Sequence, residues 1–129
     1  MSAPTQLTDA LAFLYLAFGQ VTDGALKTEE MRTLATKLQQ RMPGIELSEL
    51  GQLLRNTVEV YKGYATRDDK VAQAQLCAGF LRSNVDDKMR VAILDDLVAI
   101  AYADGEVSAD EQAFIANTAD TLGVPMPKA

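Results

Sequence analysis

Apolar residues recur along this chain at spacings of three and four positions, and no stretch sustains an alternation of apolar and polar residues. This pattern is typical of helices rather than strands. Glycine, proline and Asp-Gly pairs interrupt it at regular intervals, so we predict six helices. Their expected ranges are about 8–22, 28–41, 47–64, 66–83, 85–103 and 109–122, with Asn84 as the N-cap of the fifth.

The first and fifth of these helices are apolar on most sides. A helix of this kind is normally buried, so we expect the two to pair at the centre of the fold. The acidic pairs Asp86-Asp87 and Asp95-Asp96 are expected on solvated helix surfaces. Short loops between the helices predict antiparallel neighbours.

A short acidic phrase occurs twice, at Asp23-Gly24 and at Asp104-Gly105, 81 residues apart. A glutamate follows each aspartate seven positions later, as Glu30 and Glu111. The offset relates residues of about 8–41 to residues of about 86–122, with 47–84 as bridging helices. We therefore predict one all-α domain over residues 1–129, a compact bundle of six to seven helices with an internal pseudo-two-fold repeat of helix hairpins. Both Asp-Gly corners are expected near each other at one end.

The second corner matches only the later half of an EF-hand loop. Ile100 and Tyr102 would occupy its first and third ligand positions, and neither can bind a cation, so an EF-hand is excluded. A capping box is an explanation that needs no metal, because Ser108 and Glu111 have the required S-x-x-E spacing. Such a cap contributes roughly 1 kcal/mol.

The remaining acidic residues at the corners favour a cation. Asp104 follows a helix C-terminus, where the helix dipole disfavours an anion, and four carboxylates crowd the second corner. The first corner is weaker, because Lys27 competes there. The candidate metal ligands are Asp23, Glu30, Asp104, Glu106, Asp110 and Glu111, with an expected Kd on the order of 10⁻⁴ M or weaker.

Composition limits the chemistry further. The 129 residues contain no histidine, which excludes imidazole-based metal sites and histidine-dependent catalysis, so a metal must be held by oxygen. Oxygen ligands suit Ca²⁺ first, with Mg²⁺ or Mn²⁺ as alternatives. The net charge of −6 argues against nucleic acid as a partner. The one cysteine, Cys77, lies in an apolar stretch and is expected to be buried. No run is long enough to insert in a membrane, and a cytoplasmic location is expected.

Residues 97–111, from Leu97 to Glu111, resemble the TerB family of tellurite-resistance proteins, and residues 19–30 do so more weakly. The resemblance implies an all-helical cytoplasmic domain with an internal repeat and an acidic face that binds Ca²⁺. It also implies a role in stress resistance together with a TerC-like membrane protein. The family's acidic signature falls on Asp23, Glu30, Asp104, Glu106 and Glu111. Ala25 and Lys27 depart from that signature in the first copy.

Two functions remain open at this stage. The first is a non-enzymatic module that binds a divalent cation at the corners and presents an acidic face to a protein partner. The second is a metal-independent acidic adaptor, in which the Asp-Gly corners serve only as caps. No catalytic residues are expected, and the chain is expected to be a monomer or weak dimer.

Overall fold

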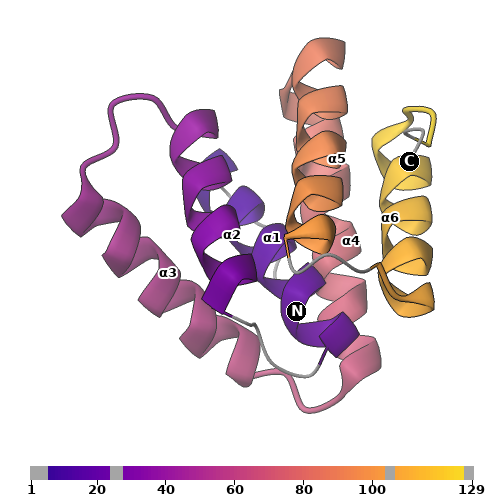
Figure 1. Cartoon of the computed structure of the whole chain (residues 1–129), viewed down its shortest axis with the longest axis horizontal. Coiled ribbons are helices and arrows are strands. Elements are labelled where there is room, and N and C mark those ends of the chain that lie inside the picture. The colour runs from indigo at the N-terminus through magenta and orange to yellow at the C-terminus, as the bar shows by residue number, and fades with distance from the viewer. Residues whose placement is uncertain (1–5, 24–27, 104–106, 127–129) are drawn as a thin grey trace.

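The computed structural model describes residues 6–23, 28–103 and 107–126, with residues 21–23, 28 and 29 described by their backbone alone. These residues form six helices and no strand, as the sequence predicts (Figure 1). The helices are α1 (Leu7–Asp23), α2 (Thr28–Arg41), α3 (Leu47–Lys62), α4 (Arg67–Asn84), α5 (Asp87–Tyr102) and α6 (Ala109–Leu122). None of the described helices is both long and apolar enough to span a bilayer.

The junction between α4 and α5 differs from the prediction. Asn84 is the last residue of α4, and its side-chain amide donates to the carbonyl oxygen of Phe80 at 2.7 Å. Val85 is extended, and Asp86 is the N-cap of α5, accepting from the backbone N–H of Met89 at 2.8 Å. Asn and Asp cap equally well, so local sequence could not choose between them. The exposed positions predicted for Asp86 and Asp87 are confirmed.

Helix α1 is the centre of the hydrophobic core. Every residue from Ala10 to Phe18 is at most 5 % exposed, which confirms the prediction from its all-round apolar sequence. Aromatic contacts join it to other elements: the ring of Phe13 lies against Tyr61 and Tyr64, and Phe18 lies edge-on to Phe114 of α6.

The expected central pairing of the first and fifth helices is wrong. Helix α1 packs chiefly against α4, and its contact with α5 is minor. Helix α4 turns Ala74, Cys77 and Ala78 toward the core, all at most 1 % exposed. Small side chains allow two helix backbones to approach closely, which favours α4 as the partner of the bulky α1. Helix α5 keeps a solvent-facing side, where Val91 is 45 % exposed.

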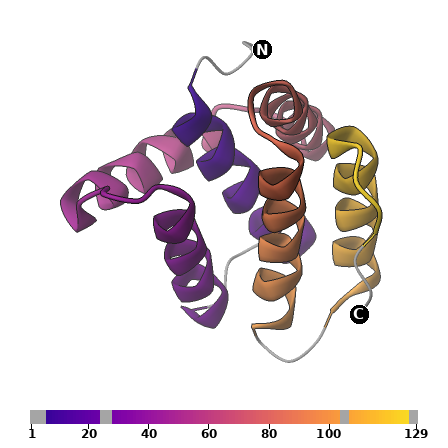
Figure 2. The same cartoon turned by 90° about the horizontal axis from the view of Figure 1, so that it is seen from above.

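The helices that flank the Asp-Gly corners are directed toward one end of the bundle. Figure 2 shows α1 and α5 running toward the end from which α2 and α6 start. The offset of 81 residues carries the bounds of α2 onto those of α6, from Thr28–Arg41 to Ala109–Leu122. A pseudo-two-fold relation between the hairpins in space stays a prediction.

Candidate functional site

The end of α1 and the start of α6 lie against each other. The ring centroids of Phe18 and Phe114 are 5.3 Å apart, with the rings edge to face. Phe18 lies five positions before Asp23, and Phe114 lies three positions after Glu111. This contact brings the helix that enters the first corner beside the helix that leaves the second.

The second corner contains the predicted capping box. Ser108 is the N-cap of α6, and its hydroxyl accepts from the backbone N–H of Glu111 at 3.1 Å. In return, the backbone N–H of Ser108 donates to Oε1 of Glu111 at 2.9 Å. The two bonds satisfy amide groups that a helix start leaves without partners. Glu111 is therefore held at a fixed place, and it is only 3 % exposed.

Glu30 occupies the matching position in α2. It is the third residue of that helix, as Glu111 is the third residue of α6, and it is completely buried. A buried carboxylate costs several kcal/mol unless donors or a cation compensate for the lost water. Since both corners bury a glutamate at the same helical position, both helix starts must compensate for a carboxylate inside the fold.

Asp110 behaves differently from its neighbour. Its side chain is 65 % exposed, and its Oδ2 lies 3.9 Å from Nη2 of Arg67, which is 60 % exposed. An exposed ion pair at this distance contributes little to stability. Asp110 therefore belongs to the surface of the corner, whereas Glu111 belongs to its interior.

Three of the predicted ligands fall outside the described side chains. Asp23 is the last residue of α1, with only its backbone described, and Asp104 and Glu106 lie outside the described residues. Within the part of the chain that the structure describes, no three acidic or cysteine side chains form a cluster suited to a metal. The described geometry thus places two of the six predicted ligands, Glu30 and Glu111, inside the corner end, and a third, Asp110, at its surface.

A buried polar cluster was not predicted from the sequence. Asp96, expected on a solvated surface, is only 2 % exposed and accepts from Oη of Tyr15 at 2.5 Å. Arg41 donates to the same carboxylate through Nε at 2.8 Å and Nη2 at 3.2 Å. We call Tyr15, Arg41 and Asp96 the polar triad. A signal was present, because Asp96 lies three residues after Ile93 and four before Ile100, on the apolar face of α5.

The polar triad joins three helices in one hydrogen-bonded unit. Tyr15 comes from α1, Arg41 is the last residue of α2, and Asp96 is in α5. Burial and the neighbouring Asp96 carboxylate raise the pKa of Tyr15 well above its ordinary value, so its hydroxyl stays a donor. The hydrogen bond to Asp96 raises the pKa of Arg41 in turn. These bonds account for the triad as a structural feature without a ligand.

The thiol is as inaccessible as its apolar surroundings predict. Cys77 is 1 % exposed, and burial, followed by the nearby Asp9, raises its pKa to about 12. Thiol chemistry requires the thiolate, which is scarcely populated at neutral pH under these conditions. Cys77 is therefore a core residue.

Comparison with known proteins identifies the family. The family model described as Tellurite resistance protein TerB matches residues 9–128. The chain belongs to the TerB family. The match includes α1 almost entirely and all the other helices, so TerB membership applies to the whole bundle, both acidic corners included. No curated protein and no solved structure matches the chain in the corresponding searches.

Proposed function

We propose that this TerB-family chain is a non-enzymatic module that binds a divalent cation at its two acidic corners and acts on a protein partner. The observation that carries the proposal is the burial of Glu30 and Glu111 at the third position of α2 and α6. Two carboxylates, one from each corner, lie at the same end of the bundle (Figure 2), and carboxylate oxygens are the ligands that hard cations take. Tellurite resistance or a related stress response is the setting that family membership suggests.

The ligand set of the proposal comprises Glu30 and Glu111 from the interior and Asp23, Asp104 and Glu106 from the corner sequences. Asp110 contributes at the surface, where its Oδ2 also lies 3.9 Å from Nη2 of Arg67. All of these are oxygen ligands, and the chain contains no histidine, so a hard cation is favoured. Ca²⁺ is the first choice because it tolerates irregular carboxylate geometry, and Mg²⁺ or Mn²⁺ are the alternatives.

Cation binding would change the charge of the corner surface. A divalent ion would add two positive charges to a chain whose net charge is −6, and it would hold both helix starts together. A partner that binds this surface would then distinguish the cation-bound form of the protein from the cation-free form. We propose a protein partner in the cytoplasm, with a TerC-like membrane protein as the first candidate.

The test is a thermal melt in EDTA and in about 10 mM CaCl₂, MgCl₂ or MnCl₂. A site with Kd near 10⁻⁴ M would be stabilised by roughly 2.7 kcal/mol at that excess, a rise in Tm of several degrees. The double variant Asp104→Asn/Glu111→Gln should lose the rise, and Asp95→Asn, an exposed aspartate of α5, should keep it. The absence of a shift with all three ions would reject the cation site.

The second candidate is a metal-independent acidic adaptor, favoured by the completed capping box at Ser108 and Glu111. The two functions differ in how salts affect partner binding. With a soluble segment of a TerC-like protein as the probe, Ca²⁺ should strengthen binding of a cation-dependent module. For an adaptor, Ca²⁺ should only weaken binding by screening the charges.

A further inference from the structure

A second site lies away from the acidic corners, at the opposite end of α2. It is a pocket of about 490 Å³ between the start of α1, the end of α2 with the following loop, α3, and the start of α5. Ligand pockets in proteins are commonly about 300–1,000 Å³ and mostly apolar, with a few polar groups. The size and the lining of this pocket meet both conditions.

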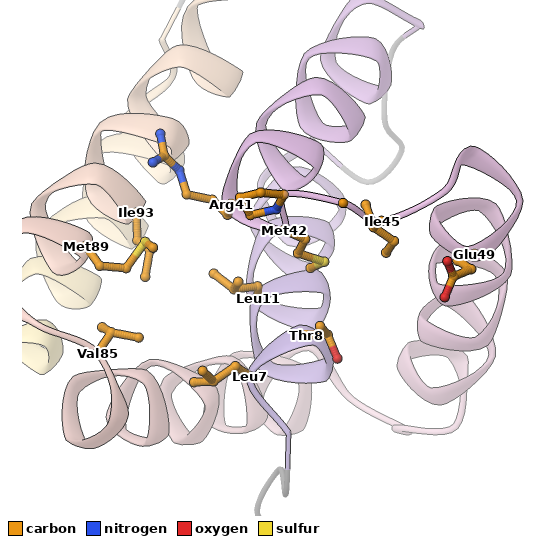
Figure 3. A pocket seen from close by; sticks show the side chains of 12 residues that line it. Leu7, Thr8, Leu11, Arg41, Met42, Ile45, Glu49, Val85, Met89 and Ile93 are labelled. Atoms are coloured by element: carbon orange, nitrogen blue, oxygen red, sulfur yellow. The ribbon is translucent and has the colours of Figure 1, made fainter.

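The apolar wall is continuous along α5 and α1. Met89 and Ile93 lie four residues apart on α5, and Val85, the extended residue just before its N-cap, continues this apolar stripe. Figure 3 shows Leu7 and Leu11 of α1 facing this stripe across the pocket. Leu7 is 39 % exposed at the rim, whereas Leu11 and Ile93 are buried at the base.

One cation lines the pocket, and it is held in place. Arg41 is the only Lys or Arg among the lining residues, all of which are described. Its side chain is 23 % exposed, and its bonds to Asp96 fix the guanidinium beside α5. A guanidinium carries five N–H donors, so two bonds to Asp96 do not exhaust its donor capacity. A fixed donor at the end of an apolar channel is preorganised for a ligand with an acceptor head.

The charges around the pocket favour one orientation of a bound ligand. Glu49 lines the α3 side, opposite the Arg41 end, and its Oε1 accepts from the backbone N–H of Glu46 at 3.3 Å (Figure 3). An anionic head is disfavoured there, whereas Arg41, although paired with Asp96, keeps further N–H donors that can bind a carboxylate. An alkyl chain that starts at Arg41 can then follow Ile93, Met89 and Val85 toward Leu7.

We propose that this pocket binds a free medium-chain fatty acid, with the carboxylate on Arg41 and the chain along the α5 stripe. Two methionines, Met42 and Met89, line the walls, and their flexible thioether side chains adapt to chains of different shape. The proposal is independent of the cation site, so its test is carried out in EDTA.

The probe is decanoate, kept below its micelle concentration, titrated into protein labelled with ¹³C at the methionine methyl groups. The Met42 and Met89 signals should shift and saturate, while Met31 and Met126, which do not line the pocket, stay in place. Decanol, which lacks the charge, should bind at least tenfold more weakly. Absence of a shift, shifts at Met31 and Met126 equal to those at Met42 and Met89, or equal affinity for decanol would overturn the proposal.

Two tryptophan variants separate pocket binding from loss of the fold. Leu7→Trp places an indole at the partly exposed rim and should abolish the decanoate shifts with the amide spectrum otherwise preserved. Leu76→Trp, at a 45 % exposed position of α4 outside the pocket, should bind like the wild type. If Leu7→Trp bound decanoate as the wild type does, the proposed position of the fatty acid in this pocket would be wrong.

Discussion

Asp96 shows how a single buried charge is accommodated in this fold. Its carboxylate is almost entirely removed from water, yet three donor groups from α1 and α2 reach its two oxygens. Hydrogen bonds to a charged acceptor are stronger than those between neutral groups. The arrangement compensates for desolvation and also fixes the relative placement of three helices.

We expect Asp96→Asn to lower the free energy of unfolding by about 3 kcal/mol, because removing one partner of a buried ion pair leaves the other uncompensated. Tyr15→Phe, which deletes only one hydroxyl, should cost about 1 kcal/mol. Urea denaturation provides the measurement. The matched control Asp95→Asn, at an exposed position of the same helix, should stay within about 0.5 kcal/mol of the wild type. An equal effect of the Asp95 and Asp96 variants would refute the role given to the polar triad.

Cys77 makes stability depend on pH in the alkaline range. The unfolded thiol loses its proton near its ordinary pKa of 9.0, whereas burial raises the pKa to about 12 in the fold. The stabilising effect of the neutral thiol is therefore complete below pH 9 and is lost as the pH rises toward 12. Between pH 8 and pH 10 the wild type should lose about 1 kcal/mol more than Cys77→Ala, since one pKa unit corresponds to about 1.36 kcal/mol. Parallel pH profiles from urea denaturation would contradict this assignment.

The contrast between Asp95 and Asp96 marks a limit of sequence analysis at the scale of residues. Each residue of a helix turns by about 100°, so two neighbouring aspartates can face solvent and core respectively. The spacing of Asp96 from Ile93 and Ile100 indicated the core side. Nothing local indicated that Arg41, 55 residues earlier, would neutralise it.

At the scale of helices, termini are controlled by a few residues with special backbone geometry. Gly123 ends α6 with φ of 74°, a left-handed conformation that other residues adopt at a cost. The Gly-Val-Pro sequence that follows α6 predicted this end correctly. The start of α5 was missed, because Asn84 and Asp86 are equally suitable caps and only packing decides between them.

Two glycine substitutions should have opposite effects on stability. Gly123→Ala should destabilise by about 1 kcal/mol, because the backbone of residue 123 has a positive φ and the added Cβ would lie 3.0 Å from Cζ of Arg82. Gly79→Ala, inside α4 with no atom beyond its own turns of the helix within 4 Å of the added Cβ, should stabilise by about 0.5–1 kcal/mol. Melting temperatures of the two variants provide the comparison. A stabilising Gly123→Ala would contradict the assigned helix end.

The pairing of helices was less predictable than their existence. The run from Ala10 to Phe18 indicated that α1 would be buried, but burial alone does not show which helix packs against it. Alanine and cysteine at 74, 77 and 78 make α4 the closest fit for α1, and that preference depends on side-chain shape across two helices. Hydrophobic periodicity does not carry this information.

At the scale of the whole molecule, the bundle separates two surfaces of different chemistry. One end contains the helix starts that bury Glu30 and Glu111. The other contains the apolar pocket beside Arg41. The polar triad adjoins the pocket, because its member Arg41 lines the pocket at the end of the helix whose first turn contains Glu30.

The sequence predicted part of the candidate site. The repeated phrase identified Glu30 and Glu111, and the S-x-x-E spacing predicted the bonds at Ser108. It did not separate the exposed Asp110 from the buried Glu111, because this distinction depends on the angle at which α6 packs on α1.

Isothermal titration of CaCl₂ into the metal-free protein is the most direct test of the central claim that both corners form one cation site. We predict one ion per chain, with binding lost in Glu30→Gln and in Glu111→Gln and retained in Asp95→Asn. Amide spectra of the variants verify that each is folded. Absence of binding, or binding that Glu30→Gln leaves unchanged, would contradict a shared site.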